Sequence, residues 1–270
     1  MMLHAKANKL AFMLFSSMLI CSCTPQPQPD SDAPQPLPTG AIAKVISLQE
    51  TSLKNLASSG DQYAQFELGC LYLGSGQNER DGLAWLRRAA DSGCLQALCR
   101  IGDFYRTGKH VSFDLSQAAS WYQKAAESGH AEAQYRYGEC LEEGYGVKID
   151  EKVAKEWYLK SAEQQYPRAQ YALATTAADD SEVLRLLNAA SEKDDPQAIL
   201  LLGDYYKHGR HSLSIDNERA ETLYTKATDI LRRSADGGDA EAQRELGLCY
   251  ASGKGVAKDE SQAEKWLRIS

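Results

Sequence analysis

Three features are scarce in this 270-residue sequence, and each scarcity excludes a class of protein. Basic residues are outnumbered, because 30 Lys and Arg against 37 Asp and Glu give a net charge of −7. Nucleic acids and anionic lipid surfaces need a basic face, so neither is expected as a partner. No apolar run reaches the about 20 residues of a membrane-spanning helix. Only two of the eight prolines lie beyond residue 40, and residues 41–270 have the composition of a globular protein with a core.

Catalytic and metal-binding motifs are also absent from the sequence. It contains no HExxH, CxxC, Walker, GxSxG or Rossmann pattern, and neither Ser-x-x-Lys nor Lys-Thr-Gly. The five histidines are scattered, and only His208 and His211 lie close together, in a predicted loop. We interpret this pair as loop polarity rather than as a metal site. The sequence therefore predicts no catalytic residue, no metal and no cofactor.

Residues 1–22 have the features of a secretory signal. A positively charged start is followed by eleven largely apolar residues, LAFMLFSSMLI. The following ICSC, which ends at Cys23, resembles the lipobox of bacterial lipoproteins. The resemblance implies cleavage before Cys23 and a lipid anchor on its sulfur, and Thr24 after it implies sorting to the outer membrane. A plainly secreted protein is the alternative.

A proline-rich segment comes next, and residues 23–42 are predicted to be an extended tether. TPQPQPDSDAPQPLPTG, at residues 24–40, holds six of the eight prolines and no hydrophobic pattern. At roughly 3 Å per residue it would separate an anchor from a folded domain by up to about 50 Å. Residues 43–60 are predicted to form an N-terminal capping helix, because SLKNLASSG matches the end of a later repeat, YQKAAESG.

The rest of the chain repeats one segment, seen most clearly in AEAQYRYGECLEEGYGV and AEAQRELGLCYASGKGV. In each copy, apolar residues recur at fixed offsets that fall on one face of a helix, so each copy is predicted to begin with a helix. A glycine inside a helix costs about 1 kcal/mol relative to alanine, so we expect a second helix to pack closely there. We call this small residue the reference position, and its six copies are Gly69, Gly102, Gly138, Ala174, Gly203 and Gly247.

A second helix is predicted in each copy after a loop of the form G-x-G-V-x-x-D. The glycines suit the end of the first helix, and the aspartate suits the cap of the second. Tryptophan occupies one place in this second helix, and we interpret it as a packing anchor rather than as part of an aromatic ligand site. The four tryptophans of the chain are all found there, at Trp85, Trp121, Trp157 and Trp266.

The whole pattern resembles the Sel-one-like repeat, a branch of the tetratricopeptide-repeat superfamily. The resemblance implies an all-α fold, a right-handed α-solenoid of stacked antiparallel helix pairs. Residues 61–270 would hold six repeats, at about 61–93, 94–129, 130–166, 167–194, 195–238 and 239–270.

Two copies depart from the pattern. The fourth lacks the glycines and the loop and has Arg185 at the tryptophan place, so we expect it to be the weakest part of the array. The fifth carries a seven-residue duplication, close to two helical turns, which should lengthen its second helix.

In the family that this pattern resembles, the first helices line the concave side. The positions two before and one after the reference position vary most, which makes them candidates for partner binding: Arg100, Asp103, Arg136 and Glu139, with Tyr135 and Tyr171 as aromatic anchors. The alternative is that they form solvated charge pairs along each helix.

Five cysteines remain beyond Cys23. Cys70 and Cys99 lie on neighbouring first helices, and an oxidising compartment would permit a disulfide between them. An odd number leaves at least one thiol unpaired in a monomer. Cys140 and Cys249 stand where other copies have large apolar residues, and we interpret them as buried small hydrophobes.

These patterns predict a lipid-anchored, non-catalytic scaffold or adaptor of the bacterial cell envelope, facing the periplasm or the cell surface. Its partner would be a protein or peptide on the concave face. Two alternatives come from the family resemblance. One is a β-lactam-binding or β-lactam-hydrolysing enzyme, as proposed for cysteine-rich members. The other is a factor for envelope polysaccharide or peptidoglycan assembly.

Overall fold

A computed structural model describes residues 50–76 and 78–269. The predicted signal sequence, the lipobox with Cys23 and the tether lie outside the described residues. Residues 50–58 are helical, and Ala57 is buried there against Ala64 and Leu68 of the first repeat. The part of the chain from residue 49 onward forms one compact unit, which is described by itself below.

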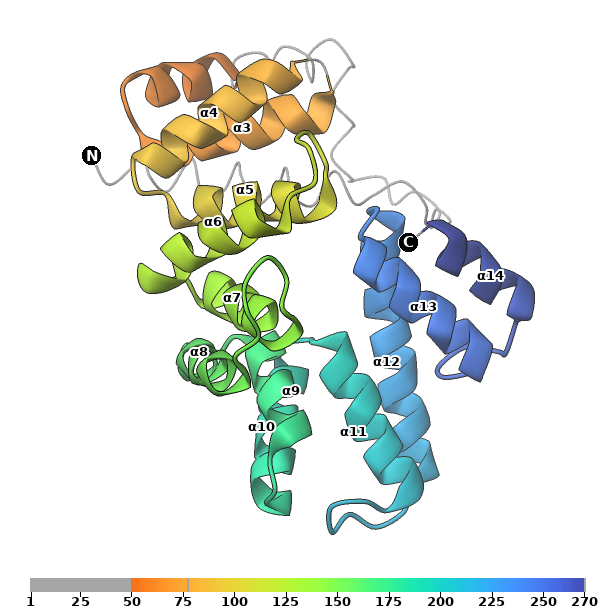
Figure 1. Ribbon diagram of the computed structural model, residues 1–270. Helices are drawn as coiled ribbons and strands as arrows, with labels where there is room; N and C mark the ends of the chain where they lie inside the picture. The colour runs from red at the N-terminus through yellow and green to blue at the C-terminus, as the bar shows by residue number, and fades with distance from the viewer. Residues whose placement is uncertain (1–49, 77, 270) are drawn as a thin grey trace, which may run out of the picture. The chain divides into compact units, whose positions relative to one another are not determined.

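Within the described ranges, the helices form antiparallel pairs, and each pair is one repeat (Figure 1). Each second helix also packs against the first helix of the following pair, which makes the array a solenoid. The all-α solenoid predicted from the repeats is confirmed. The pairs are α3 (Gln62–Ser75) with α4 (Glu79–Asp91), α5 (Leu95–Thr107) with α6 (Leu115–Glu127), α7 (Ala131–Glu143) with α8 (Glu151–Glu163), α9 (Pro167–Thr176) with α10 (Asp180–Glu192), α11 (Pro196–His208) with α12 (Asn217–Asp236), and α13 (Ala240–Ser252) with α14 (Glu260–Ile269).

Close approach between the two helices of a pair explains the small residue at the reference position. A Cβ added at Gly102 would lie 2.6 Å from Cε1 of Tyr122, and one added at Gly138 would lie 2.6 Å from Cε1 of Tyr158. Leu86, Tyr224 and Leu267 make the same contact in three other repeats. The fourth repeat has alanine at the reference position and the shorter Leu186 at the contacting place.

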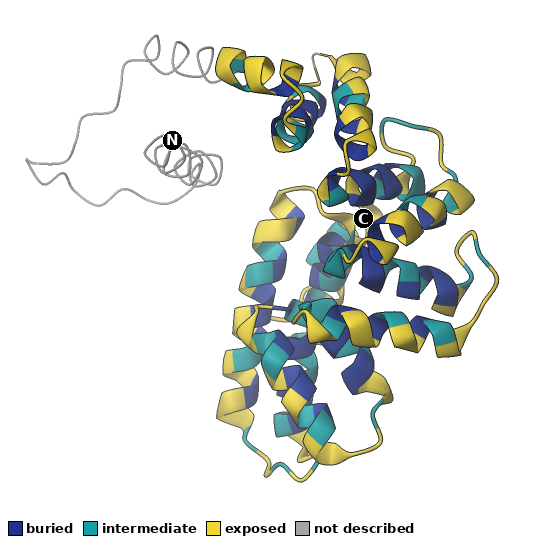
Figure 2. Cartoon of the chain, turned by 90° about the vertical axis from the view of Figure 1, so that its left-hand side faces the viewer, coloured by how far each residue is buried: buried dark blue, intermediate teal, exposed yellow. Residues whose placement is uncertain are grey.

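The contacting residue is in each case the one directly after the tryptophan place. Tyr122 is fully buried, whereas Trp121 beside it is only partly buried and has the Nζ atom of Lys124 4.7 Å from its ring centroid. The tightest packing within a repeat is therefore made by the neighbour of the tryptophan, a position that sequence reasoning did not single out. Figure 2 shows the same division along every helix, with buried residues where helices meet and exposed residues on the outside.

The predicted helix caps are confirmed. The Asp150 side chain accepts a hydrogen bond from the backbone N–H of Val153 at 3.0 Å. Equivalent caps are made by Asp114, Asp216 and Asp259. The first helices other than α9 end at glycines with left-handed backbone, as at Gly144, where φ is 75°.

The loops between the two helices of a pair also join successive repeats. In the third repeat, a Cβ at Gly146 would lie 2.2 Å from the backbone carbonyl carbon of Leu115, at the start of the preceding second helix. In the second and fifth repeats a histidine with positive φ stands two residues after the glycine that ends the first helix. His110 Nδ1 lies 3.2 Å from Glu79 Oε1, and His211 Nδ1 lies 2.7 Å from Asp180 Oδ1. His211 thus holds two repeats together, a more specific role than the loop polarity predicted for it.

The two atypical repeats also differ from the others in structure, and the lengthened second helix predicted for the fifth repeat is confirmed. The first helix of the fourth repeat, α9, has 10 residues, and Arg185 is exposed and paired with Glu182 at 2.7 Å. The second helix of the fifth repeat, α12, is a single helix of 20 residues, where α6, α8 and α10 have 13.

Candidate partner-binding surface

The inner face of the array, defined here as the side formed by α5, α7, α9, α11 and α13, holds most of the charged residues that sequence reasoning singled out. Arg136 NH1 donates to Glu139 Oε2 at 3.0 Å, an i,i+3 pair of the kind considered as the alternative. Arg100 is exposed, and Asp103 accepts a hydrogen bond from the Tyr122 hydroxyl at 2.8 Å. The buried tyrosine thus positions Asp103 on this face.

The two aromatic candidates lie in different surroundings. Tyr135 is only 6% exposed, packs between the rings of Tyr158 and Tyr166, and donates its hydroxyl proton to Glu139 at 2.7 Å. Burial and Glu139 raise the pKa of its hydroxyl. Tyr135 therefore supports the surface from below. Tyr171 is partly buried, and burial, with Glu245 of α13 nearby, raises the pKa of its hydroxyl.

A network of ion pairs crosses the inner face from the fourth repeat to the sixth. Arg168 on α9 donates to Glu241 of α13 at 2.6 Å, and its Nε lies 3.1 Å from the carboxylate of Asp195. Gln197 at the start of α11 also donates to Glu241, at 3.4 Å. Burial favours a raised pKa at Glu241, but Arg168 holds it below its ordinary value. This bridge of Arg168, Asp195, Gln197 and Glu241 joins the starts of α9, α11 and α13.

A cavity of about 570 Å³ lies beside this bridge. Its walls come from the second and third repeats on one side and from the sixth repeat on the other, although these repeats are about 100 residues apart in the sequence. The lining residues are Arg106, Tyr122, Arg136, Glu139, Cys140, Tyr145, Ala240, Glu241 and Arg244. Arg136 and Glu139 were predicted, whereas Arg106, Tyr122 and Arg244 were not, because no pattern along the chain places α13 opposite α5 and α7.

The three arginines of this cavity have unequal hydrogen-bond partners. Arg106 donates from Nε to the Tyr122 hydroxyl at 3.3 Å, and no carboxylate among the described residues forms an ion pair with it. Arg136 uses NH1 for Glu139, while its Nε is buried without a hydrogen-bond partner in the described structure. Arg244 pairs with its chain neighbour Glu245 at 2.6 Å. A buried donor without an acceptor costs free energy, so the Nε of Arg136 weakens this part of the surface slightly.

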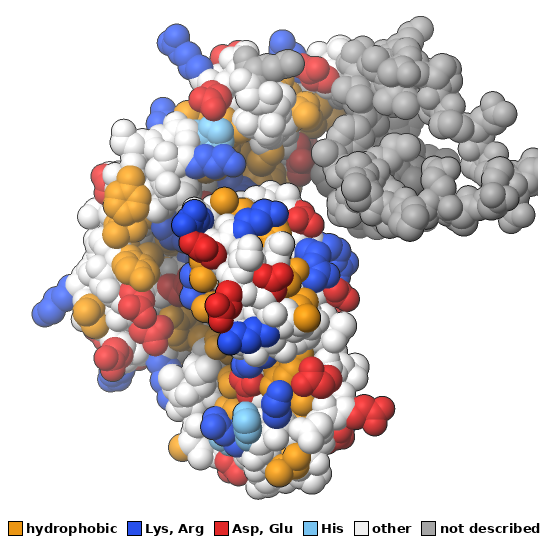
Figure 3. All heavy atoms as spheres, turned by 90° about the vertical axis from the view of Figure 1, so that its right-hand side faces the viewer, with side chains coloured by type: hydrophobic (Ala, Val, Ile, Leu, Met, Phe, Trp, Pro, Cys, Tyr) orange, Lys and Arg blue, Asp and Glu red, His pale blue; other side chains and the backbone are white. Residues whose placement is uncertain are grey.

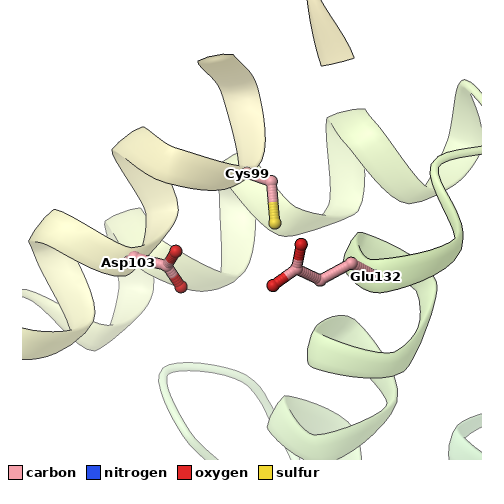
Figure 4. A group of neighbouring side chains, drawn as sticks. All are labelled: Cys99, Asp103 and Glu132. Atoms are coloured by element: carbon pink, nitrogen blue, oxygen red, sulfur yellow. The ribbon is translucent and has the colours of Figure 1, made fainter. Parts of the chain in front are cut away.

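Three potential metal-ligand atoms meet next to this cavity (Figure 4). They belong to Cys99, Asp103 and Glu132 and lie within 4.8 Å of one another. Burial, with Glu132 and Asp103 nearby, raises the pKa of the Cys99 thiol, which keeps it protonated at neutral pH. Arg136 and Arg100 are close enough to oppose that shift, and the same positive charges oppose a metal cation.

The five described cysteines are all free thiols in the structure. Cys140 and Cys249 are buried, at 3% and 1% exposure, as expected for small hydrophobes. Burial raises the pKa of the partly buried Cys70 thiol to about 11, and its charged or thiol neighbours are Arg100, Glu67 and Cys94. The pairing of Cys70 with Cys99 stays a prediction.

A second cavity, of about 530 Å³, lies on the outer side between α8, α9 and α10. Its lining includes Arg185, the residue at the tryptophan place, together with Leu159, Leu173 and Leu186. Because Arg185 extends into solvent with 65% of its side chain exposed, it leaves this space open. The cavity thus lies at the repeat that lacks the tryptophan.

On the face drawn in Figure 3, basic and acidic side chains are interleaved. Within residues 50–76 and 78–269, no helix is long and apolar enough to cross a membrane.

Comparisons with known proteins agree with this architecture. A sequence model described as Sel1 repeat matches residues 62–94, 95–130, 131–166, 196–229 and 240–270. It leaves out the fourth repeat, the one that lacks the glycines and the loop. No relative was detected among functionally curated proteins.

Three solved structures illustrate the likeness. The protective antigen c5321 of uropathogenic Escherichia coli, described as displaying an SLR fold, is 29% identical over 82% of this chain, with a TM-score of 0.54. The chain spans 48% of that protein's length. A Sel1 repeat protein from Oxalobacter formigenes is 28% identical over 76% of this chain and 82% of its own, with a TM-score of 0.54. Cysteine rich protein B of Helicobacter pylori is 27% identical over 44% of this chain and 93% of its own, with a TM-score of 0.38.

Proposed function

The chain belongs to the Sel1 repeat family, whose members generally act as protein-interaction scaffolds, and from this we propose that it is a lipid-anchored, non-catalytic scaffold of the bacterial cell envelope. Its partner would be a protein or peptide bound on the inner face. The observation that carries the proposal is the cavity of about 570 Å³ between α5, α7 and α13, whose lining includes Arg106, Arg136 and Arg244.

The inner face has the properties of a recognition surface. Tyr122, Asp103 and Arg106 hold one another by hydrogen bonds at 2.8 and 3.3 Å, so these side chains are ordered before a partner arrives. Pre-ordered side chains lose less conformational entropy on binding, which favours affinity. Arginine and tyrosine are also the residue types that most often contribute strongly to binding at interfaces.

The anchor rests on residues 20–23, Ile-Cys-Ser-Cys, which match the lipobox pattern. Replacing Cys23 with alanine should abolish metabolic labelling of the protein by a radioactive or clickable fatty acid. Cys21→Ala is the matched control and should leave the labelling largely intact. Equal labelling of wild type and the Cys23→Ala variant would show that Cys23 is not the acylated residue.

The scaffold function is tested by crosslinking in intact cells, followed by purification of the full-length protein from detergent-solubilised envelope. We expect defined partner proteins, crosslinked through residues introduced on α5, α7 or α13. Residues introduced on the outer side of α10 serve as the control and should give no such product. Crosslinks confined to the outer side would contradict the assignment of the inner face.

The enzyme alternative is tested on the same preparation with nitrocefin, a chromogenic β-lactam. A non-catalytic scaffold should give the same rate as buffer. Turnover that copurifies with the protein and survives removal of its partners would refute the proposal.

A further inference from the structure

In the described chain, loops tie neighbouring repeats together at four of the five joints between the six repeats. Two of these ties are contacts from a loop histidine to the carboxylate that begins the preceding second helix. His110 Nδ1 lies 3.2 Å from Glu79 Oε1, which ties the second repeat to the first. His211 Nδ1 lies 2.7 Å from Asp180 Oδ1, which ties the fifth repeat to the fourth.

The other two ties are close backbone contacts at the second glycine of a loop. A Cβ at Gly146 would lie 2.2 Å from the backbone carbonyl carbon of Leu115, so the third repeat touches the second. A Cβ at Gly255 would lie 2.3 Å from the backbone oxygen of Tyr224, so the sixth repeat touches the fifth. The joint between the third and fourth repeats has no such tie among the described residues, because residues 177–179 join α9 to α10 without a glycine loop.

Open space lies on both sides of this untied joint. On the outer side is the cavity of about 530 Å³ between α8 of the third repeat and α9 and α10 of the fourth. On the inner side is the cavity of about 570 Å³, where the second and third repeats face the sixth. Apolar packing fills the joint between them: the ring centroids of Tyr135 and Tyr166 are 5.6 Å apart, and Leu173 is buried in the same cluster as Tyr158. Close-packed interiors resist rotation, whereas open space on either side permits it.

Each half of the array is held together more firmly than this joint. One hydrophobic cluster runs from Leu73 of α3 to Cys140 of α7 and so spans the first three repeats. In the last three repeats, the two loop ties are joined by the bridge on the inner face. Arg168 of the fourth repeat contacts Glu241 of the sixth at 2.6 Å and Asp195, at the start of the fifth, at 3.1 Å. The contacts therefore define two bodies that meet where α8 is followed by α9.

We propose that the first three and the last three repeats move as two rigid bodies about a hinge between α8 and α9. The two cavities lie on opposite sides of this hinge, so the motion widens one as it narrows the other. Opening the inner cavity brings α10 towards α8 and covers Leu159, an apolar residue of the outer cavity that is 46% exposed. Closing the inner cavity carries Glu241 towards Arg106 and Arg136 on the opposite wall, where opposite charges attract. The hinge does not depend on the scaffold function, but it would set the width of the inner face that a partner meets.

The test measures distances by single-molecule fluorescence energy transfer on the full-length protein in detergent micelles. Dyes are attached through azide-bearing residues introduced at the exposed last residues of first helices, so the native cysteines are not used. Three pairs each span two joints: Ser75 with Glu143, Glu143 with His208, and Thr176 with Ser252. Only the second pair crosses the hinge, so its transfer efficiency should be distributed more broadly than that of the other two and should fluctuate on a timescale of about 1 μs to 1 ms. Equal widths for all three pairs, or the greatest width in a pair that does not cross the hinge, would overturn the proposal.

Two variants assign the motion to the open cavity and the missing tie. Arg185→Trp would fill part of the outer cavity, so it should narrow the distribution of the pair that crosses the hinge. Arg185→Gln is the matched control and should leave that distribution broad. His211→Ala removes the tie between the fourth and fifth repeats and should broaden the distribution of the pair that joins the fourth repeat to the sixth. An unchanged distribution in Arg185→Trp, or in His211→Ala, would refute the corresponding part of the assignment.

Discussion

Gly102 offers the sharpest test of how the two helices of a repeat fit together. Alanine is the better helix former by about 1 kcal/mol, so Gly102→Ala would stabilise an isolated helix. In the folded protein, however, the new Cβ would lie 2.6 and 2.8 Å from two ring carbons of Tyr122, where carbon atoms normally keep about 3.5–4.0 Å. The side chain of Tyr122 is fully buried.

The cost has two parts. Overpacking of this kind costs about 1–3 kcal/mol. A displaced Tyr122 ring would also weaken the 2.8 Å hydrogen bond from its hydroxyl to Asp103, and a hydrogen bond to a charged group contributes about 1.5–3 kcal/mol. After the gain in helix propensity is subtracted, we expect Gly102→Ala to lower the free energy of unfolding by about 3 kcal/mol. In a chain of this size, that corresponds to a fall in Tm of roughly 6–12 °C.

Thermal unfolding and urea unfolding, both followed by circular dichroism, measure this loss. Gly74→Ala is the matched control, because Gly74 also lies in a first helix but has no atom within 4 Å of its added Cβ, and it should raise the stability by up to about 1 kcal/mol. The double variant Gly102→Ala/Tyr122→Leu copies the Ala174 and Leu186 pair of the fourth repeat. It should be more stable than the sum of the two single changes predicts, by about 1–2 kcal/mol. A Gly102→Ala protein as stable as the wild type, or strictly additive effects, would refute the reasoning.

Three further predictions concern other parts of the array. Burial lowers the pKa of His130, the N-cap of α7, and Glu132 opposes that shift. As the pH falls below about 6.5, the unfolded chain takes up a proton at this histidine more readily than the folded chain, so the free energy of unfolding falls. In urea unfolding, the His130→Asp variant should lose less stability than the wild type between pH 7.5 and pH 5.5. The same pH dependence of the free energy of unfolding in both proteins would show that His130 is not its cause. In hydrogen exchange, the amides of residues 170–195 should exchange faster than those of the third repeat. Arg185→Trp should slow this exchange, because the larger side chain would fill part of the outer cavity of about 530 Å³. Uniform protection in the wild type would show that the fourth repeat is not the least stable part of the array. Gly146→Ala should lower Tm more than the control Gly129→Ala. Both glycines have positive φ, but only at Gly146 would the new Cβ lie against the backbone of the preceding repeat, at 2.2 Å. Equal losses of Tm would mean that this contact does not hold the repeats together.

Local features of the fold were predictable because their causes lie within a few residues. The period of small and apolar residues defines one face of each first helix, and an aspartate such as Asp150 can cap only the helix that follows it. The duplication in the fifth repeat lengthens α12 without disturbing its apolar face, because seven residues make nearly two full turns. The fourth repeat, which lacks the glycine loop, has the short helix α9.

Two features within a repeat were less predictable. The sequence predicted the tryptophan as a packing anchor without saying what it packs against, and the structure places Tyr122 against the reference glycine and leaves Trp121 partly buried. Both residues lie on the same helix, about 100° apart, so the rotation of the second helix against the first decides which of them enters the interface. Tyr135, which the sequence suggested as an aromatic anchor, is buried beside the rings of Tyr158 and Tyr166.

By itself, the sequence determined the number of repeats, the two helices of each, their caps and the variable positions on the first helices, including Arg136 and Glu139. Only the tertiary structure decided that Arg244 lies across a cavity from Arg106, and that Arg168 reaches Glu241 at 2.6 Å. The physical reason is that the curvature of a solenoid is the sum of small rotations at each interface between repeats. A pattern within one repeat records the packing of that repeat, whereas the meeting of the second repeat with the sixth depends on every interface between them.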